Sequence, residues 1–296
     1  MLRVCLLAGL IALTSATAPA QTPHPSLREI AESGDPQAAY VYGLELTFPE
    51  DGDPDLVTGR YWLVQAANEG IAPANHILGV VYRDGIGVDG DLDRARAFFE
   101  LSWQAGDPAA GYDLADLLLY DYADERPTAI AILESLITDA GFGPLARLTL
   151  AEILMFDDET DGDTARAVTL ARDALAEQPE LIRAHYLLGI AAAEGLDGPV
   201  DQTGARHAWG AGAAAGDPLA LSALADSWMD PEWGEPDPVE AMLLYELAAA
   251  LGDDFAADRA AALAIELGGS SSDSIETRRI DLLSRLGWEI PPGQPE

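Results

Sequence analysis

The fold of this chain is decided by the stretch LGVVYRDGIGVDGDLDRA, which runs from Leu78 to Ala95 and continues as RAFFELSWQAG to Gly106. Apolar residues at helical spacing lead into a turn with three glycines, after which the helical spacing resumes. This order predicts two helices joined by a tight turn, which we name helix A and helix B. One such pair cannot bury its own apolar faces, so neighbouring pairs are expected.

The helix pair recurs with a period near 36 residues. Glycines mark the end of each helix B at spacings of 36, 36, 35, 75, 36 and 35 residues, and they are Gly34, Gly70, Gly106, Gly141, Gly216, Gly252 and Gly287. The gap of 75 residues holds two units, with Gln178 in the place of one glycine. The seven units lie near residues 34–69, 70–105, 106–140, 141–177, 178–215, 216–251 and 252–287. The period predicts a repeat architecture.

Each unit repeats the same columns of side chains. Small residues occupy the fourth and ninth positions and a large apolar residue the eighth, as in Ala74, Gly79 and Leu78. These positions share one face of a helix, where small residues allow close approach of two backbones. Helix B has an apolar column seven residues before the closing glycine, formed by Leu63, Phe99, Trp209, Tyr245 and Ile280. We therefore predict an all-α fold, a right-handed superhelical solenoid of about seven antiparallel helix pairs.

Start and stop residues fall in the same register as the apolar columns. Asp35, Asp107 and Asp217 each precede a proline, which predicts aspartate N-caps with proline in the first turn of helix A. The closing glycines are predicted to adopt a left-handed backbone conformation, which glycine reaches at little cost.

The second unit resembles the Sel-one-like repeat, a relative of the tetratricopeptide repeat with a slightly longer period. The residues that carry the resemblance are Leu78, Gly79, Tyr82, Gly85, Gly87, Val88, Asp91, Arg94 and Ala95. It extends from about Gly34 to Gly287, although only the second unit has the complete glycine turn, and the third and fourth units match least well. The resemblance implies a tetratricopeptide-like solenoid that acts as a scaffold for protein interaction.

Both ends of a solenoid must be closed against solvent. Residues 21–33 are predicted to form an N-terminal cap segment, with a short helix after Ser26. At the other end we expect a final amphipathic helix with Asp273 as its cap, followed by a disordered tail over residues 288–296, which is rich in proline.

Residues 1–20 have the features of a cleaved signal peptide. Arg3 precedes an apolar run from Val4 to Leu13, and the motif A-P-A ends directly before Gln21. The run is too short to span a bilayer, so no membrane insertion is expected after cleavage. The only cysteine, Cys5, lies inside this segment, too early to accept a lipid after the cleavage site. We expect a periplasmic or extracellular chain whose fold is stabilised without disulfides.

The charge of the chain restricts its partners. It has 51 acidic residues against 16 basic ones, all of them arginine, and a net charge of −35. Nucleic acid is excluded as a partner because its recognition needs a basic surface. The predicted partner is a protein or peptide that is basic or bridged by cations, with association that weakens as salt is added.

The sequence predicts no catalytic residue and no cofactor. The stretch from Gly85 to Gly90 fits the dinucleotide pattern G-x-G-x-x-G, but it follows a predicted helix where that motif needs a strand. No serine lies in G-x-S-x-G, and none of His24, His76, His185 and His207 belongs to H-E-x-x-H. Acidic residues are so frequent that the spacing of two carboxylates cannot distinguish a catalytic acid and base from a chance pair.

One acidic stretch leaves calcium binding open, although no residue is predicted to be a metal ligand. Asp89, Asp91, Asp93 and Glu100 fit positions 1, 3, 5 and 12 of a calcium loop, yet Arg94 stands where the sixth position requires glycine. The alternative is a solvated turn in which Asp91 or Asp93 caps helix B.

Other features also have two interpretations. The acidic run from Asp157 to Asp163 lacks a twelfth calcium ligand, because Val168 stands there. His76 lies on a packing column and His207 lies beside Trp209 in a predicted helix B, so both are interpreted as structural. Trp233 lies outside every column, so it either anchors a partner or folds back on its own helices.

Two classes of function follow. The leading hypothesis is a non-catalytic, exported scaffold or adaptor for protein interaction in the cell envelope. The alternative is a hydrolase directed at the cell wall or at β-lactams, an activity assigned to cysteine-rich exported relatives. The mature chain would have no cysteine, which weakens that alternative.

Overall fold

The computed structural model describes residues 26–156, 163–268 and 272–289. Within these ranges the chain forms helices and turns and no β-strand. The helices are α1 (Leu27–Glu32), α2 (Pro36–Thr47), α3 (Leu56–Asn68), α4 (Ala72–Arg83), α5 (Leu92–Gln104), α6 (Pro108–Asp121), η2 (Ala123–Glu125), α7 (Arg126–Leu136), α8 (Gly143–Phe156), α9 (Thr164–Glu177), α10 (Arg183–Glu194), α11 (Gln202–Ala214), α12 (Pro218–Met229), η4 (Pro231–Trp233), α13 (Pro238–Ala250), α14 (Asp254–Glu266) and α15 (Ser272–Leu286).

The chain divides into two compact units, Met1–Phe98 and Phe99–Glu296, which we describe separately. In the first unit α1 packs against α2, α2 against α3, and α3 against α4. A capping box starts α1: the Ser26 hydroxyl accepts the Glu29 N–H at 3.3 Å, and the Glu29 carboxylate accepts the Ser26 N–H at 2.7 Å. This helix lies where the sequence predicts a short leading helix.

Helices α2 and α3 cross with their backbones in contact. A Cβ atom on Gly43 would lie 2.9 Å from the Gly59 carbonyl oxygen, and one on Gly59 would lie 2.4 Å from the Thr47 hydroxyl oxygen. Larger side chains therefore do not fit at this crossing. The small residue predicted at the ninth position, Gly43, is confirmed as a contact between helix A and helix B.

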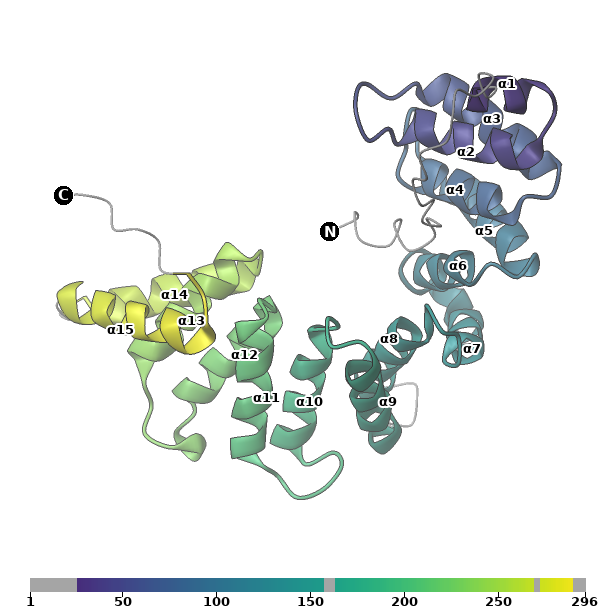
Figure 1. Ribbon diagram of the computed structural model, residues 1–296. Helices are drawn as coiled ribbons and strands as arrows, with labels where there is room; N and C mark the ends of the chain where they lie inside the picture. Colours follow the sequence, from purple (N-terminus) through teal and green to yellow (C-terminus); the bar gives the residue numbers. More distant parts are fainter. Residues whose placement is uncertain (1–25, 157–162, 269–271, 290–296) are drawn as a thin grey trace, which may run out of the picture. The chain divides into compact units, whose positions relative to one another are not determined.

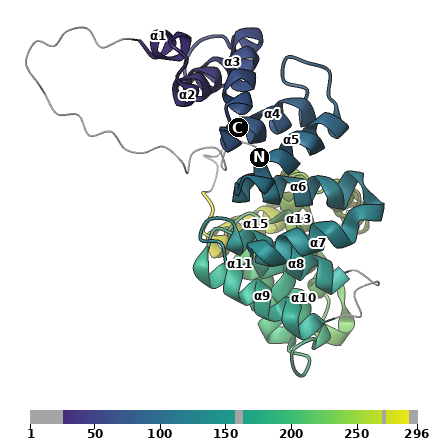
Figure 2. The same ribbon diagram turned by 90° about the vertical axis from the view of Figure 1, so that its right-hand side faces the viewer.

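The second compact unit, Phe99–Glu296, continues the pattern of helix pairs. Helix α6 packs on α7, α8 on α9, α10 on α11, and α12 on α13. Helices A also contact one another, α8 with α10 and α10 with α12, so that they form one layer (Figure 1). Figure 2 shows α9 next to α8 and α10. The alanines of the fourth position are completely buried where the helices pack together, and they are Ala110, Ala146, Ala184 and Ala220. The predicted all-α solenoid of stacked helix pairs is confirmed.

The predicted helix starts are confirmed as well. The carboxylates of Asp35, Asp107 and Asp217 accept backbone N–H groups at distances of 2.8, 3.1 and 3.0 Å. Aspartates also cap several helices for which no cap was predicted: Asp55 for α3, Asp163 for α9, Asp201 for α11, Asp237 for α13 and Asp253 for α14.

The closing glycines adopt the left-handed conformation in six of seven cases within the described chain. Their φ angles run from 72° to 101°, at Gly34, Gly70, Gly106, Gly216, Gly252 and Gly287. The prediction is wrong at Gly141, whose φ is not positive, because α7 already ends at Leu136. There Asp139 forms the turn, accepting the N–H groups of Gly141 and Phe142 at 2.9 and 2.8 Å.

The last helix contacts two earlier units and departs from the sequence prediction in two respects. Helix α15 contacts α13 and α11, so it reaches back over helices B of two earlier units. Ile280, predicted to be in the apolar column, is 42% exposed, while Leu283 and Leu286 of the predicted amphipathic helix are buried, together with Leu282. Asp273 lies in the first turn of α15 and does not precede it.

The C-terminal boundary also differs from the prediction. Trp288, expected to begin the disordered tail, is half-buried, and its indole N–H donates to the carbonyl oxygen of Ala214 at 2.9 Å. The predicted signal peptide at residues 1–20, the acidic residues 157–162 and residues 290–296 of the tail lie outside the described residues.

Candidate functional site

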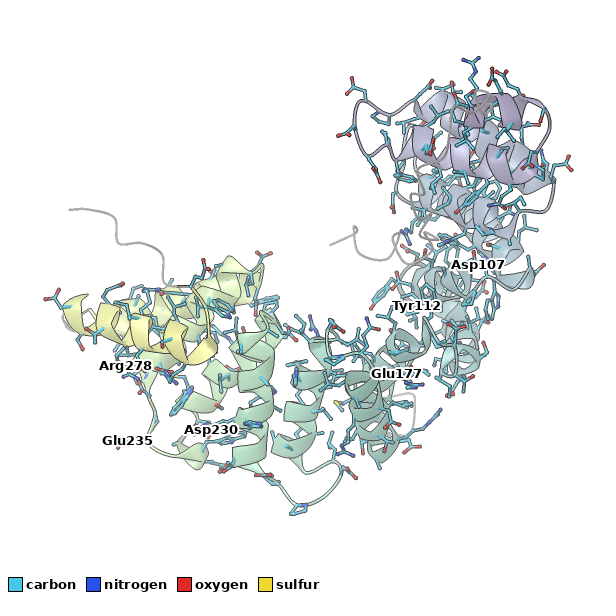
Figure 3. All side chains as sticks on the ribbon, viewed as in Figure 1. Asp107, Tyr112, Glu177, Asp230, Glu235 and Arg278 are labelled. Carbon is cyan, nitrogen blue, oxygen red and sulfur yellow. The ribbon has the colours of Figure 1, made fainter. Side chains whose placement is uncertain are left out.

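Aromatic and acidic side chains lie along the helices A of the second compact unit, Phe99–Glu296. Their spacing of three or four residues places them on one face of each helix. We define this aromatic–acidic face by Tyr112, Asp116 and Tyr120 of α6, Thr149, Glu152 and Phe156 of α8, and Arg183 and Tyr186 of α10. Figure 3 labels Tyr112 on this part of the molecule.

Contacts between helices join these residues into one surface. The hydroxyl groups of Tyr112 and Thr149 lie 3.1 Å apart and form a hydrogen bond between α6 and α8. The rings of Phe156 and Tyr186, on α8 and α10, have centroids 6.4 Å apart. The Arg183 guanidinium stacks over the Tyr186 ring at 5.7 Å. The face is therefore continuous across three successive units.

A hollow opens on this face between α6, α7 and α8. Its volume is 170 Å³, and it is lined by Leu119, Tyr120, Arg126, Thr149, Glu152, Ile153 and Phe156. Tyr120 is 75% exposed and Phe156 is 54% exposed, so two large aromatic surfaces border the hollow. Aromatic side chains beside a pocket are frequent hot spots of protein interfaces.

The carboxyl groups of the face are partly desolvated. Burial raises the pKa of Glu152, the charge of Asp217 raises it further, and Arg183 opposes both effects. Burial also raises the pKa of Tyr112 to about 12, with smaller contributions from the charges of Asp116 and Glu152. A cation bound at this face would relieve the repulsion among these groups.

Asp217 is the most deeply buried carboxylate behind the face. Its side chain is 1% exposed, and burial raises its pKa. One oxygen caps α12, while Oδ2 has no hydrogen-bond partner in the described chain and lies 3.4 Å from Nε of Arg183. The equivalent Asp107 receives a hydrogen bond from Ser102 at 2.9 Å. Gly212 stands in the place of that serine before Asp217, which explains the unsatisfied oxygen.

A second carboxylate, on α12, is already occupied. Asp226 accepts hydrogen bonds from the Tyr245 hydroxyl and from Arg259, the latter at 2.5 Å. Burial raises the pKa of Tyr245 to about 12, and its bond to Asp226 adds to this rise. This triad links α12, α13 and α14 and has a structural role.

The possible calcium loop has a structural explanation. Asp91 accepts the Arg94 N–H at 3.0 Å and directly precedes α5, while Asp93 and Glu100 lie within that helix. Gly85 and Gly87, with φ angles of 68° and 67°, form the turn between α4 and α5. Across the described ranges, no group of three or more His, Cys, Asp or Glu side chains is arranged to hold a metal ion.

Trp233 folds back onto its own helices. Its ring stacks on that of Trp209, with centroids 5.6 Å apart and an angle of 20° between the planes. Trp209 is buried, whereas His207, predicted to be structural, is exposed, and His76 is half-buried. The structure therefore favours packing over partner anchoring for Trp233.

The exposed aromatics of the face were missed by sequence reasoning. Tyr120 and Phe156 lie in the last turns of α6 and α8, where an apolar residue is indistinguishable from a core residue by spacing alone. Both stand ten residues after a buried alanine, Ala110 and Ala146, and this shared register was the available indication.

Comparison with known proteins identifies the repeat. The model of the Sel1 repeat family matches residues 36–71, 72–107, 182–216 and 218–253, which correspond to the first, second, fifth and sixth units. A protective antigen of uropathogenic Escherichia coli with an SLR fold is 21% identical, with a TM-score of 0.66 over 88% of this chain and 55% of that one. The present chain thus spans about half the length of that antigen. A Sel1 repeat protein from Oxalobacter formigenes is 22% identical, with a TM-score of 0.63 over 88% of this chain and 74% of that one.

No curated protein matches the chain. The stacked helix pairs and the four matched segments place it in the class of α-helical repeat proteins. Within that class the chain belongs to the Sel1 repeat family, which is the Sel-one-like repeat named above, and whose members are typically scaffolds for protein interaction. In the described part of the chain, no helix has the length and apolar character required to cross a bilayer.

Proposed function

We propose that this protein is an exported, non-catalytic scaffold of the cell envelope that binds a basic protein or peptide through its aromatic–acidic face. The observation that carries the proposal is the hollow of 170 Å³ bordered by the exposed rings of Tyr120 and Phe156. The hollow is lined by exposed rings and by Glu152 as well as by Arg126, and it suits a basic or aromatic side chain, because ring faces and carboxylates both attract cations.

The charge of the chain supports a basic partner. A net charge of −35 attracts a cationic protein over a distance of about a Debye length, ~10 Å at 0.1 M salt. The raised pKa of Glu152 indicates a partly desolvated carboxyl group, for which a partner cation would supply the missing compensation. Bridging by divalent cations is the second route by which a less basic partner could be held.

Export rests on the sequence of the first twenty residues, with Arg3, the apolar run and the A-P-A motif. A periplasmic or extracellular location accords with a chain that retains no cysteine after cleavage. Mass determination of the N-terminus of the protein recovered from periplasmic extract tests this part, and a chain that begins at Met1 would contradict it.

The partner is tested by crosslinking and capture of the tagged, exported chain at low and moderate salt. We expect one enriched basic protein, whose recovery falls by about tenfold in the variant Tyr120→Ser/Phe156→Ser. Val200→Ser, at a loop residue that is 60% exposed, is the matched control and is expected to bind normally. Unchanged recovery in the double variant, or turnover of cell-wall fragments or a β-lactam by the pure protein, would overturn the proposal.

A further inference from the structure

A second hollow lies among the helices B and owes one of its walls to the position of α15. Its volume is 360 Å³, and α11, α12, α13 and α15 all contribute to it. We call it the α15 pocket and define it by Arg206, His207, Gly210, Trp228, Glu240 and Arg285, together with leucines of α12 and α15. It includes no residue of the aromatic–acidic face.

The charge in the α15 pocket is reversed relative to the rest of the chain. Two arginines and a histidine line it against one carboxylate, whereas the whole chain has 51 acidic residues for 16 arginines. Both oxygens of that carboxylate, Glu240, are already occupied: Oε1 by Arg285, and Oε2 by Arg278 at 3.1 Å. Glu240 is 3% exposed and is thus neutralised within the protein. Arg278 is labelled in Figure 3.

Arg206 is held rigidly without a carboxylate. Its Nε donates to the Ser227 hydroxyl at 3.1 Å and its Nη2 to the Ser227 carbonyl oxygen at 2.6 Å. The guanidinium carbon lies 4.2 Å from the centroid of Trp228 and 5.6 Å from that of Trp233. No ion pair of Arg206 occurs among residues 26–156, 163–268 and 272–289. Its Nη1 donors are therefore not used by any of these contacts.

Gly210 supplies an independent observation. It lies inside α11, where glycine costs about 1 kcal/mol relative to alanine. A Cβ atom there would meet nothing within 4 Å, so neither packing nor a positive φ requires glycine. By contrast, a Cβ on Gly212 in the same helix would lie 2.7 Å from the Cβ of Ala220. Gly210 lines the pocket, so the absence of a side chain there leaves the pocket open.

We propose that the α15 pocket binds a small organic carboxylate with an apolar body. The carboxylate would pair with Arg206 and His207, whose N–H groups suit an anionic oxygen. The apolar body would lie against Trp228 and the leucines of α12 and α15, as in small-molecule sites that are mostly apolar with few polar groups.

Calorimetry with cyclohexanecarboxylate tests this inference, with cyclohexanecarboxamide and acetate as comparison probes. We expect the carboxylate to bind about tenfold more tightly than either, since the amide lacks the charge and acetate lacks the apolar body. Equal affinity for carboxylate and carboxamide, or no measurable binding of the carboxylate, would overturn the proposal.

The variant Gly210→Leu places a bulky side chain in the pocket, at a position where a Cβ atom meets nothing within 4 Å. We expect it to abolish carboxylate binding and to keep or raise Tm, because leucine favours the helix more than glycine does. Thr203→Leu, at an exposed position of the same helix, is the control and is expected to bind normally. Unchanged binding in Gly210→Leu would place the ligand elsewhere and overturn the assignment.

The dependence of binding affinity on salt distinguishes this inference from the proposed function. Capture of a basic partner weakens as salt screens the net charge, but an anion approaches a protein of like charge, so its affinity should stay constant or rise with salt. A tenfold loss of carboxylate affinity between about 20 and about 300 mM NaCl would contradict binding in the α15 pocket. Failure of the Tyr120→Ser/Phe156→Ser test leaves the α15 pocket unaffected, because the two sites share no residue.

Discussion

Single glycines within helices have opposite roles in this protein. A Cβ atom on Gly189 would lie 2.2 Å from the indole nitrogen of Trp209, so α10 and α11 can pack at their present distance only without a side chain there. Gly210 faces open space in the neighbouring helix. Sequence alone shows both as glycines inside helices. Only their neighbours in space show that packing requires glycine at position 189 and does not require it at position 210.

Alanine substitution is expected to separate the two. Gly189→Ala should lower the free energy of unfolding by about 1–3 kcal/mol through overpacking against a rigid ring, and Gly210→Ala should raise it by about 0.5–1 kcal/mol. Urea unfolding followed by circular dichroism measures both. If the two variants shifted in the same direction, the difference in packing would not account for their effects.

Buried aspartate caps are the second feature at the scale of the residue. Asp217→Asn keeps an N-cap of equal quality and removes the charge of a buried carboxylate whose own Oδ2 has no hydrogen-bond partner in the described chain. We expect a gain of about 1 kcal/mol at pH 7. Folding raises the pKa of Asp217, so the protonated side chain contributes stability to the wild-type chain below the unfolded pKa. This contribution is lost as pH rises through the folded pKa.

The gain in Asp217→Asn should therefore vanish near pH 3, where both chains are neutral at this position. Thermal melts from about pH 3 to about pH 7 measure the difference. Asp35→Asn, at a helix cap that remains exposed to solvent, is the control and should show no such gain. A gain that is constant across this range would contradict the assignment to Asp217.

Helix α15 is the element whose position most affects the molecule. It contacts α13 and α11, and its Arg278 and Arg285 both pair with the buried Glu240 of α13. Trp288 adds a hydrogen bond to the end of α11 at 2.9 Å. These contacts explain why the helix lies over earlier units, because a buried carboxylate requires cationic partners.

Removal of both arginines should show how far the stability of the fold depends on their ion pairs with Glu240. Arg278→Ala/Arg285→Ala is expected to lower the free energy of unfolding by about 1–3 kcal/mol, less than for a fully buried pair because both arginines are partly exposed. Adding Glu240→Gln should restore part of the loss. Arg172→Ala, at a pair with 59% and 43% exposed side chains, should change stability by at most about 1 kcal/mol. Loss in Arg172→Ala equal to that of the double variant would contradict this explanation.

At the scale of the whole molecule the dominant property is charge. With a net charge of −35 and no lysine, the folded chain repels itself, although many aspartates are used as helix caps where the helix dipole favours them. Screening should relieve the repulsion. We expect Tm to rise by about 2–4 °C, the equivalent of about 1 kcal/mol, between about 10 and about 300 mM NaCl.

Differential scanning calorimetry at constant pH measures this dependence on salt. Sodium sulfate at equal ionic strength is an unsuitable control, because it stabilises proteins by exclusion, so a second chloride salt should be compared. A fall in Tm with added chloride would show that attractive ion pairs, such as Arg147–Glu177 and Arg166–Glu134, outweigh the net repulsion.

The sequence by itself determined the repeat, the order of helices and most of their ends, because these depend on local rules. Aspartate caps and left-handed glycines act within one or two turns of chain, and the period near 36 residues repeats them in the same register as the small residues of the helix crossings. The error at Gly141 arose where another residue, Asp139, formed the turn in place of glycine.

Only the tertiary structure decided which apolar and charged residues meet outside the repeat. The docking of α15 on α11 and α13, the stacking of Trp233 on Trp209 and the exposure of Tyr120 and Phe156 depend on neighbours far away in sequence. Spacing along one helix shows which residues share a face, but it does not show what covers that face. For this reason both candidate binding surfaces emerged from packing between units and not from any motif.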